Sequence, residues 1–211
     1  MKKNVVRLDG RTLTRAGLVA VARGAQVELA AEQLPAVARA ADFLAEQVRR
    51  EEPIYGVSTG FGSNADRLLG AHHVRDQLPG AKPSNETLHE ELQRNLIVTH
   101  AVCVGEPFAP EIVRAMLCIR INTLMRGHSG IRVETLQALA AMLNAGIVPV
   151  VPQLGSVGAS GDLAPLSHLA IVLLGGGEAF YQGERMKGAQ ALNRAGLAPV
   201  TLSYKEGLAL N

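Results

Sequence analysis

Gly155-Ser-Val-Gly-Ala-Ser-Gly-Asp162 is the stretch of this sequence that says most about the fold. Three of its residues are glycine and three more are alanine or serine, a composition that is typical of a tight turn. The segment after it is mostly apolar, so we expect a helix over 162–174 with Asp162 as its N-cap. The stretch therefore predicts a glycine-rich loop that leads directly into a buried helix.

The familiar glycine-rich motifs do not fit this loop. A phosphate-binding loop needs Gly-Lys followed by Ser or Thr, which is missing here. The dinucleotide fingerprint separates its first two glycines by one residue, whereas two residues separate Gly155 from Gly158. A nucleophile elbow needs Gly-x-Ser-x-Gly, and Ser160 stands in Gly-Ala-Ser-Gly. We therefore predict no nucleotide cofactor.

Ala159-Ser160-Gly161 is suited to a different chemistry. Gly161 offers an unhindered backbone nitrogen and Ala159 a carbonyl that is nearly as accessible, so a tight bend lets the nitrogen attack the carbonyl and close a five-membered ring. Loss of water from the ring and from Ser160 then leaves an exposed methylidene. None of the ordinary side chains supplies such an electrophile. On the tripeptide alone, a plain turn before a helix remains the simpler interpretation.

The composition excludes several classes of protein. The chain has 211 residues, of which 47% are hydrophobic and only 3% aromatic, which indicates a core of closely packed aliphatic helices. The net charge is +2 and the basic residues are scattered, so nucleic-acid binding is not expected. The start of the chain is charged too early for a secretory signal, and no apolar run reaches membrane-spanning length. We expect a cytoplasmic protein with no membrane contact.

Cysteine and histidine usage points to no metal centre and no disulfide framework. Cys103 and Cys118 are expected to be buried, reduced thiols. His72, His73 and His89 have no second ligand at metal-binding spacing, so no metal is predicted.

The periodicity of the apolar residues predicts a mainly α fold with short β-hairpins. Helices are expected over 14–23, 34–50, 87–104, 110–126, 132–144 and 162–174, with another that opens near 202. A short strand is expected over 26–29, extended backbone over 147–152, and a hairpin over 179–187. In the helix over 110–126 the predicted buried stripe is Ile112, Val113, Met116, Leu117 and Ile121. A second glycine-rich loop begins at Tyr55.

Three stretches together resemble the aromatic amino-acid ammonia-lyase and aminomutase family. They are Tyr55-Gly-Val-Ser-Thr-Gly-Phe-Gly, the loop from Gly155 on to His168, and Lys205-Glu-Gly-Leu-Ala-Leu, in the family's order. The resemblance implies the N-terminal part of the histidase-like (fumarase/aspartase-like) helical fold, ending before its long central helix bundle. Residues 1–211 would then form the electrophile-bearing domain of such an enzyme.

The resemblance also implies roles for individual residues. Ala159, Ser160 and Gly161 would form a 4-methylidene-imidazol-5-one, and Asp162 would help ring closure besides capping the helix. Tyr55 matches the base that removes the β-proton of the bound amino acid. A phenol is a base only as its phenolate, so we expect backbone N–H groups of the Tyr55 loop to stabilise that form.

Thr99-His100 bears on the choice of substrate. The pair is similar to the Ser-His of histidine-selective members, whereas members selective for tyrosine or phenylalanine carry His-Leu or Phe-Leu. An imidazole at His100 can hydrogen-bond a substrate imidazole, with Thr99 beside it. The resemblance thus implies elimination of ammonia from L-histidine to give urocanate. A phenylalanine or tyrosine ammonia-lyase, or an aminomutase, remains the alternative.

Other parts of the family's active site are not matched. Asn211 falls one position before the family's catalytic Asn, and the substrate-carboxylate Arg and second Tyr have no counterpart. We therefore expect this chain to be inactive alone. We also expect it to associate, because apolar faces of the helices over 87–144 would lack part of their cover. Full-length members of the family are homotetramers whose active sites combine residues of several chains. A non-catalytic scaffold that keeps the fold is the other hypothesis.

Overall fold

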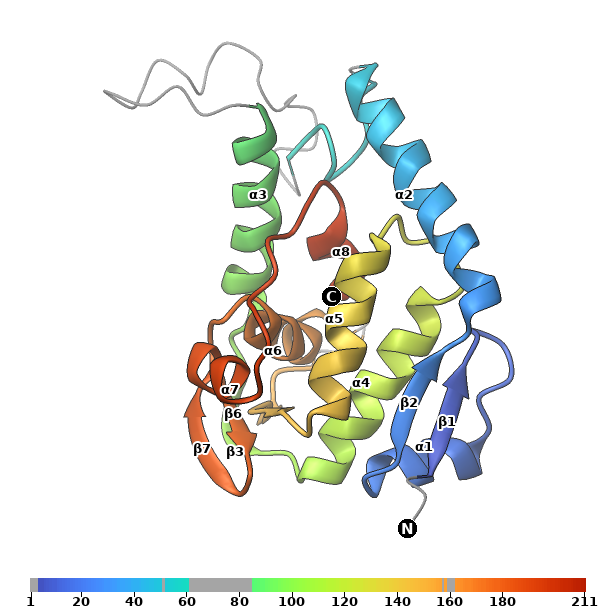
Figure 1. Cartoon of the computed structure of the whole chain (residues 1–211). Helices are drawn as coiled ribbons and strands as arrows, with labels where there is room; N and C mark the ends of the chain where they lie inside the picture. The colour runs from blue at the N-terminus through green and yellow to red at the C-terminus, as the bar shows by residue number, and fades with distance from the viewer. Residues whose placement is uncertain (1–3, 51, 61–84, 157, 159–161) are drawn as a thin grey trace.

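Two helices, α4 (Pro110–Leu124) and α5 (Val133–Asn144), lie at the centre of the computed structural model, which describes residues 4–50, 52–60, 85–156, 158 and 162–211 (Figure 1). Both were predicted, and Pro110 stands in the first turn of α4, where its missing N–H costs nothing. Their facing sides bury a set of large apolar residues: Val113, Leu117, Ile121, Leu124, Leu136, Leu139 and Leu143. The stripe predicted for α4 is wrong at Ile112, which is 45% exposed.

A β-α-β unit forms one corner of the molecule. Strands β1 (Val5–Leu8) and β2 (Gln26–Leu29) are parallel, and α1 (Arg15–Ala22) connects them. The N-cap of α1 is Thr14, whose side chain accepts a hydrogen bond from the Gly17 N–H. The strand β2 was predicted, whereas its parallel partner was not.

Buried Arg114 of α4 joins this unit to the centre of the molecule. Its guanidinium donates to the carbonyls of Val21, Ala25 and Leu143, near the C-terminal ends of α1 and α5. The carbonyls of Val21 and Leu143 also accept from the N–H groups of Gly24 and Gly146, so Arg114 adds a second hydrogen bond to each helix end.

The helices α2 (Leu34–Arg49) and α3 (Asn85–His100) run along opposite sides of the molecule (Figure 1). A short 3₁₀ turn, η1 (Ala31–Gln33), precedes α2 and its Pro35. The predicted helix over 87–104 ends earlier than expected, because β3 (Val104–Pro107) pairs antiparallel with β5 (Pro152–Leu154).

A small three-stranded sheet has the order β4-β6-β7, with β4 (Val148–Pro149), β6 (Glu178–Tyr181) and β7 (Glu184–Lys187). The predicted hairpin is confirmed, and Gln182 and Gly183 at its tip have φ of 52° and 83°, as a two-residue turn between antiparallel strands requires. The helix α7 (Gly188–Arg194) follows it and was not predicted.

The helix α6 (Leu163–Leu173) follows the glycine-rich loop, and the last helix is α8 (Glu206–Leu210). Both pack against α3, and α8 also contacts α6 (Figure 1). Within the described ranges, no helix is both long and apolar enough to span a bilayer. Cys103 and Cys118 are both buried and unbridged, as expected.

Candidate active site

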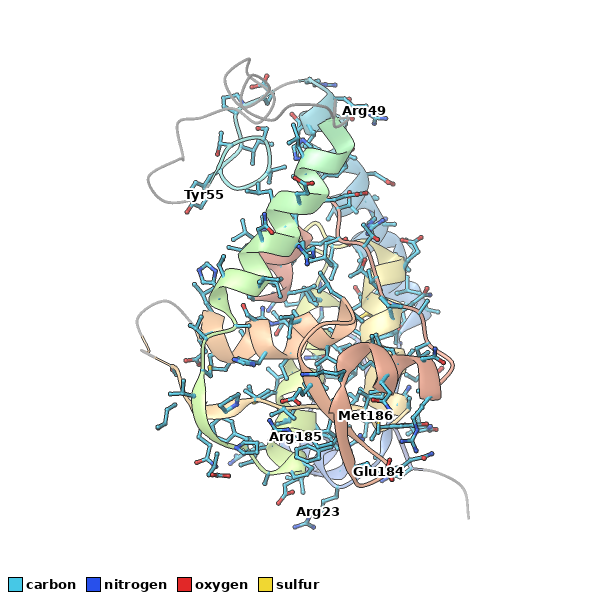
Figure 2. The ribbon with its side chains drawn as sticks, turned by 90° about the vertical axis from the view of Figure 1, so that its left-hand side faces the viewer. Arg23, Arg49, Tyr55, Glu184, Arg185 and Met186 are labelled. Atoms are coloured by element: carbon cyan, nitrogen blue, oxygen red, sulfur yellow. The ribbon has the colours of Figure 1, made fainter. Side chains whose placement is uncertain are left out.

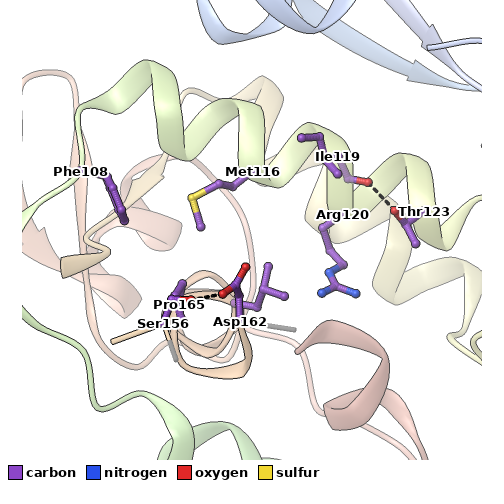
Figure 3. Close-up of a pocket in the computed structure, with 9 residues that line it drawn as sticks. Phe108, Met116, Ile119, Arg120, Thr123, Ser156, Asp162 and Pro165 are labelled. Atoms are coloured by element: carbon purple, nitrogen blue, oxygen red, sulfur yellow. Dashed lines mark hydrogen bonds between the residues drawn. The ribbon is translucent and has the colours of Figure 1, made fainter. Parts of the chain in front are cut away.

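A cavity of about 550 Å³ lies between α4 and the segment that enters α6 (Figure 3). Its lining is mostly apolar, with one cationic and one acidic side chain: Phe108, Met116, Ile119, Arg120, Thr123, Ser156, Asp162, Pro165 and Leu166. Such a cavity suits a small ligand that combines an apolar part with a charged group.

Asp162 stands at the N-cap position of α6, but its carboxylate does not cap the helix. It accepts a hydrogen bond from the Ser156 hydroxyl instead, across the residues of the loop (Figure 3). The predicted side-chain cap is therefore wrong. The reason is the backbone at Asp162, whose φ of 66° places the carboxylate away from the first N–H groups of α6.

Ala159, Ser160 and Gly161 lie outside the described residues, but the residues on either side of them are informative. Gly158 has φ of 75° and Asp162 has φ of 66°, so the backbone enters the left-handed region both before and after the tripeptide. A Cβ at position 155 would collide with Cys103 Sγ, which makes glycine necessary there. On the described flanks, Gly158 and Asp162 are thus left-handed, and Gly155 packs closely on Cys103 in the segment after α3.

Tyr55 opens the other glycine-rich loop, at the end of the molecule where α2 ends near Arg49 (Figure 2). Its side chain is 55% exposed. The loop forms a compact turn, since the N–H groups of Val57, Ser58 and Thr59 all donate to the Ile54 carbonyl. It is neither helix nor strand over 55–58, as its composition predicted.

His100 is the last residue of α3, and its Nδ1 lies 2.8 Å from the Leu96 carbonyl oxygen. A carbonyl only accepts, so Nδ1 carries the hydrogen and a neutral ring presents Nε2 as an acceptor. The Thr99 hydroxyl donates to the Asn95 carbonyl at 2.7 Å and so pairs with its own helix.

The end of α3 is tied to α6 through His168. The backbone N–H of Cys103 donates to His168 Nε2 at 3.1 Å, and burial lowers the pKa of this imidazole. The segment that carries His100 is thus fixed to the helix that follows the tripeptide.

Two side chains were missed by the sequence analysis: half-buried Arg120, which lines the cavity, and fully buried Gln93. Arg120 donates to the backbone oxygens of Ala209 and Asn211, and burial lowers its pKa. A charge inside the apolar run of α4 was the signal that could have revealed it. Gln93 gave no signal in the sequence, because its side chain hydrogen-bonds Gly56 and Gly207, which are far from it along the chain.

Asn211 itself is buried, and its Nδ2 donates to Ser167 Oγ on α6 at 3.1 Å.

Within the described part of the chain, no group of three or more His, Cys, Asp or Glu side chains is arranged to hold a metal ion.

The family model for aromatic amino acid lyases matches residues 13–211, which includes both glycine-rich loops. The chain belongs to this family.

Relatives within the family are similar over nearly the whole chain. A histidine ammonia-lyase from Symbiobacterium thermophilum is 52% identical over 202 residues, which cover 95% of this chain and 37% of that protein. The structure of histidine ammonia-lyase from Trypanosoma cruzi superposes with a TM-score of 0.83 at 38% identity, covering 98% of this chain and 37% of the other. Phenylalanine aminomutase from Pantoea agglomerans gives a TM-score of 0.83 at 35% identity, covering 99% of this chain and 37% of the other.

This lyase-family chain thus spans a little over a third of the length of the relatives it matches. Within it, Tyr55 and His100 are not adjacent. Gln93, which contacts the Tyr55 loop, is two turns from His100 on α3, a separation of about 10 Å along the helix. The Tyr55 loop therefore contacts the middle of α3, whereas His100 ends that helix.

Proposed function

We propose that this chain is the electrophile-bearing N-terminal part of an ammonia-lyase that converts L-histidine to urocanate and ammonia. The observation that carries the proposal is the likeness to proteins named histidine ammonia-lyase, at 52% and 50% identity over almost the full chain. Thr99-His100 supports the same substrate, because the Nε2 acceptor of His100 suits the N–H of a second imidazole.

The flanks of the tripeptide fit the formation of a methylidene-imidazolone. Ring closure needs the Gly161 nitrogen close to the Ala159 carbonyl, and left-handed backbone at Gly158 and Asp162 turns the chain sharply at both sides. Once formed, the group supplies an electrophile for the substrate. Asp162, oriented by Ser156, would assist ring closure by holding a proton, and the 550 Å³ cavity beside it leaves room for a ligand.

Tyr55 is proposed as the base that removes the β-proton, and His100 as the residue that selects the imidazole ring. The Tyr55 loop contacts Gln93 in the middle of α3, and His100 ends the same helix. We propose that the protein acts as a homo-oligomer, a tetramer by family resemblance. Exposed apolar side chains at Val104, Ile119 and Leu154 support such association.

The decisive experiment compares the parent polypeptide, continued to the length of its relatives, with its Ser160→Ala variant. We expect urocanate from L-histidine, no product from L-phenylalanine or L-tyrosine at comparable rates, and an intact mass two waters below the calculated one. Ser160→Ala removes the hydroxyl whose loss makes the methylidene, so both the activity and the mass deficit should disappear. Cinnamate or coumarate would identify the alternative lyases, and a β-amino acid an aminomutase. An unmodified mass without any product would favour the scaffold.

A further inference from the structure

The side chain of Gln93 lies between the Tyr55 loop and the first turn of α8. It is fully buried, its Nε2 donates to the Gly56 carbonyl at 3.2 Å, and its Oε1 accepts from the Gly207 N–H at 2.9 Å. One carboxamide therefore uses its donor end on one segment and its acceptor end on another. A buried amide with both ends satisfied resists displacement, because any shift leaves a polar group without a partner.

The approach of α8 to this side chain is close enough to require a glycine. A Cβ at position 207 would lie 2.8 Å from the Gln93 backbone oxygen and 2.9 Å from Gln93 Oε1. Even an alanine at Gly207 would push α8 away from α3.

His89, one turn earlier on α3, contacts the same two segments. Its ring packs edge-on against Tyr204 with 5.3 Å between centroids, and it hydrogen-bonds the backbone at Val57. Burial lowers the pKa of His89 from its ordinary value. Two residues of α3 thus join the Tyr55 loop to the chain around α8.

The internal hydrogen bonds of the Tyr55 loop set its shape but not its position. The N–H groups that donate to Ile54 all come from the loop itself. Contacts from Gln93 and His89 of α3 join the loop to the rest of the molecule. On the other side, α8 reaches α6 through the Asn211–Ser167 hydrogen bond, and α6 follows the tripeptide.

We propose that Gln93 is a positioning residue that holds the Tyr55 loop at a set distance from α8, and so sets where the Tyr55 hydroxyl meets the substrate. The inference rests on the proposed function, in which Tyr55 removes a proton. Gln93 does not touch the substrate. Its loss should therefore misplace the base while leaving substrate binding largely intact.

The first test needs no activity and uses this chain. In Gln93→Leu, which keeps the volume and removes both hydrogen bonds, we expect amide hydrogen exchange at Gly56 and Val57 to quicken about tenfold or more. Gln153→Leu is the matched control, since Gln153 also donates to a carbonyl, that of Pro107, but on the β3–β5 pair. Unchanged exchange in Gln93→Leu would overturn the proposal.

A second variant guards against misfolding. Gly207→Ala leaves Gln93 in place and displaces its partner, so it should quicken exchange in the same loop while circular dichroism shows the parent's helix content. A folded Gly207→Ala variant with parental exchange would also overturn the proposal.

The second test measures elimination in the parent polypeptide continued to the length of its relatives. For Gln93→Leu we expect kcat to fall about a hundredfold with little change in KM, as for a misplaced catalytic group. A raised KM with unchanged kcat would mean that Gln93 serves substrate binding, contrary to the proposal. If the parent itself releases no ammonia from any of the three amino acids, the proposed function fails and the catalytic part of this inference falls with it. The exchange measurement then still decides whether Gln93 holds the loop.

Discussion

Arg132 holds the carboxylate of Glu206 in an ion pair, with 2.7 Å between Arg132 Nη2 and Glu206 Oε2. The Glu206 side chain is 1% exposed and also accepts from the backbone N–H groups of Arg132 and Ser203. The hydrogen bond to Glu206 raises the pKa of Arg132. This pair fastens the first residue of α8 to the N-cap residue of α5.

Replacing Arg132 should therefore destabilise the protein. Arg132→Met leaves a buried carboxylate without its cation, and we expect a loss of about 2 kcal/mol in the free energy of unfolding, since Arg132 is itself partly solvated. Urea denaturation measures it. Arg185→Met, which breaks the more exposed pair with Glu178, should cost less than about 1 kcal/mol. Equal losses in the two variants would contradict this account.

Tyr55→Phe should remove the proposed base while the electrophile still forms. Removal of a general base lowers kcat by about 10²- to 10⁴-fold, and we expect a loss in that range in the full-length polypeptide. The intact mass should keep its deficit of two waters, because the role proposed for Tyr55 is proton removal and not ring closure. Parental kcat in this variant would exclude Tyr55 as the base.

His100→Leu should shift substrate preference. Without the Nε2 acceptor, the N–H of a substrate imidazole loses its partner, and we expect kcat/KM for L-histidine to fall about tenfold or more relative to L-phenylalanine. Thr99→Ser is the control, because serine keeps the hydroxyl that donates to Asn95. An unchanged ratio of the two kcat/KM values would remove His100 from substrate recognition.

Asp162→Asn should slow formation of the electrophile. Asparagine tolerates the left-handed backbone and still accepts from Ser156, so the variant removes mainly the charge. We expect ring closure to slow about a hundredfold. Intact mass, measured at successive times after synthesis, monitors the loss of the two waters. In the control Asp42→Asn, on the exposed side of α2, the ring should close at the parent's rate. Parental maturation in Asp162→Asn would show that its carboxylate is not needed.

Asp9 should make stability depend on pH in the acid range. Hydrogen bonds from the Thr12 hydroxyl, the Thr12 N–H and the Arg11 N–H lower the pKa of Asp9 from 3.8 to about 2. The unfolded chain therefore binds the proton more readily, so the contribution of Asp9 is full above pH 3.8 and is lost as the pH falls towards 2. Urea unfolding of the parent and of Asp9→Asn should differ at pH 6, and the difference should shrink between pH 4 and pH 3. A difference that is constant with pH would contradict the assignment.

Features with local causes were predictable from the sequence. The bounds of α2 and α5 and the hairpin over 179–187 follow from apolar spacing and turn chemistry within a few residues. The family followed from motifs that are themselves contiguous, and the family model confirms it over 13–211. The roles of Tyr55, Thr99, His100 and Asp162, and of the tripeptide at 159–161, stay predictions.

The tertiary structure alone decided the features that depend on distant partners. The helix α3 stops at His100 because the chain after it pairs with β5, and the Asp162 carboxylate turns to Ser156 because its own backbone is left-handed. The two hydrogen bonds of the Gln93 amide depend on the fold, because their partners Gly56 and Gly207 are remote in the sequence. Apolar periodicity and caps act over neighbouring residues and leave a local pattern, whereas a hydrogen bond between remote segments depends on the folded path of the whole chain.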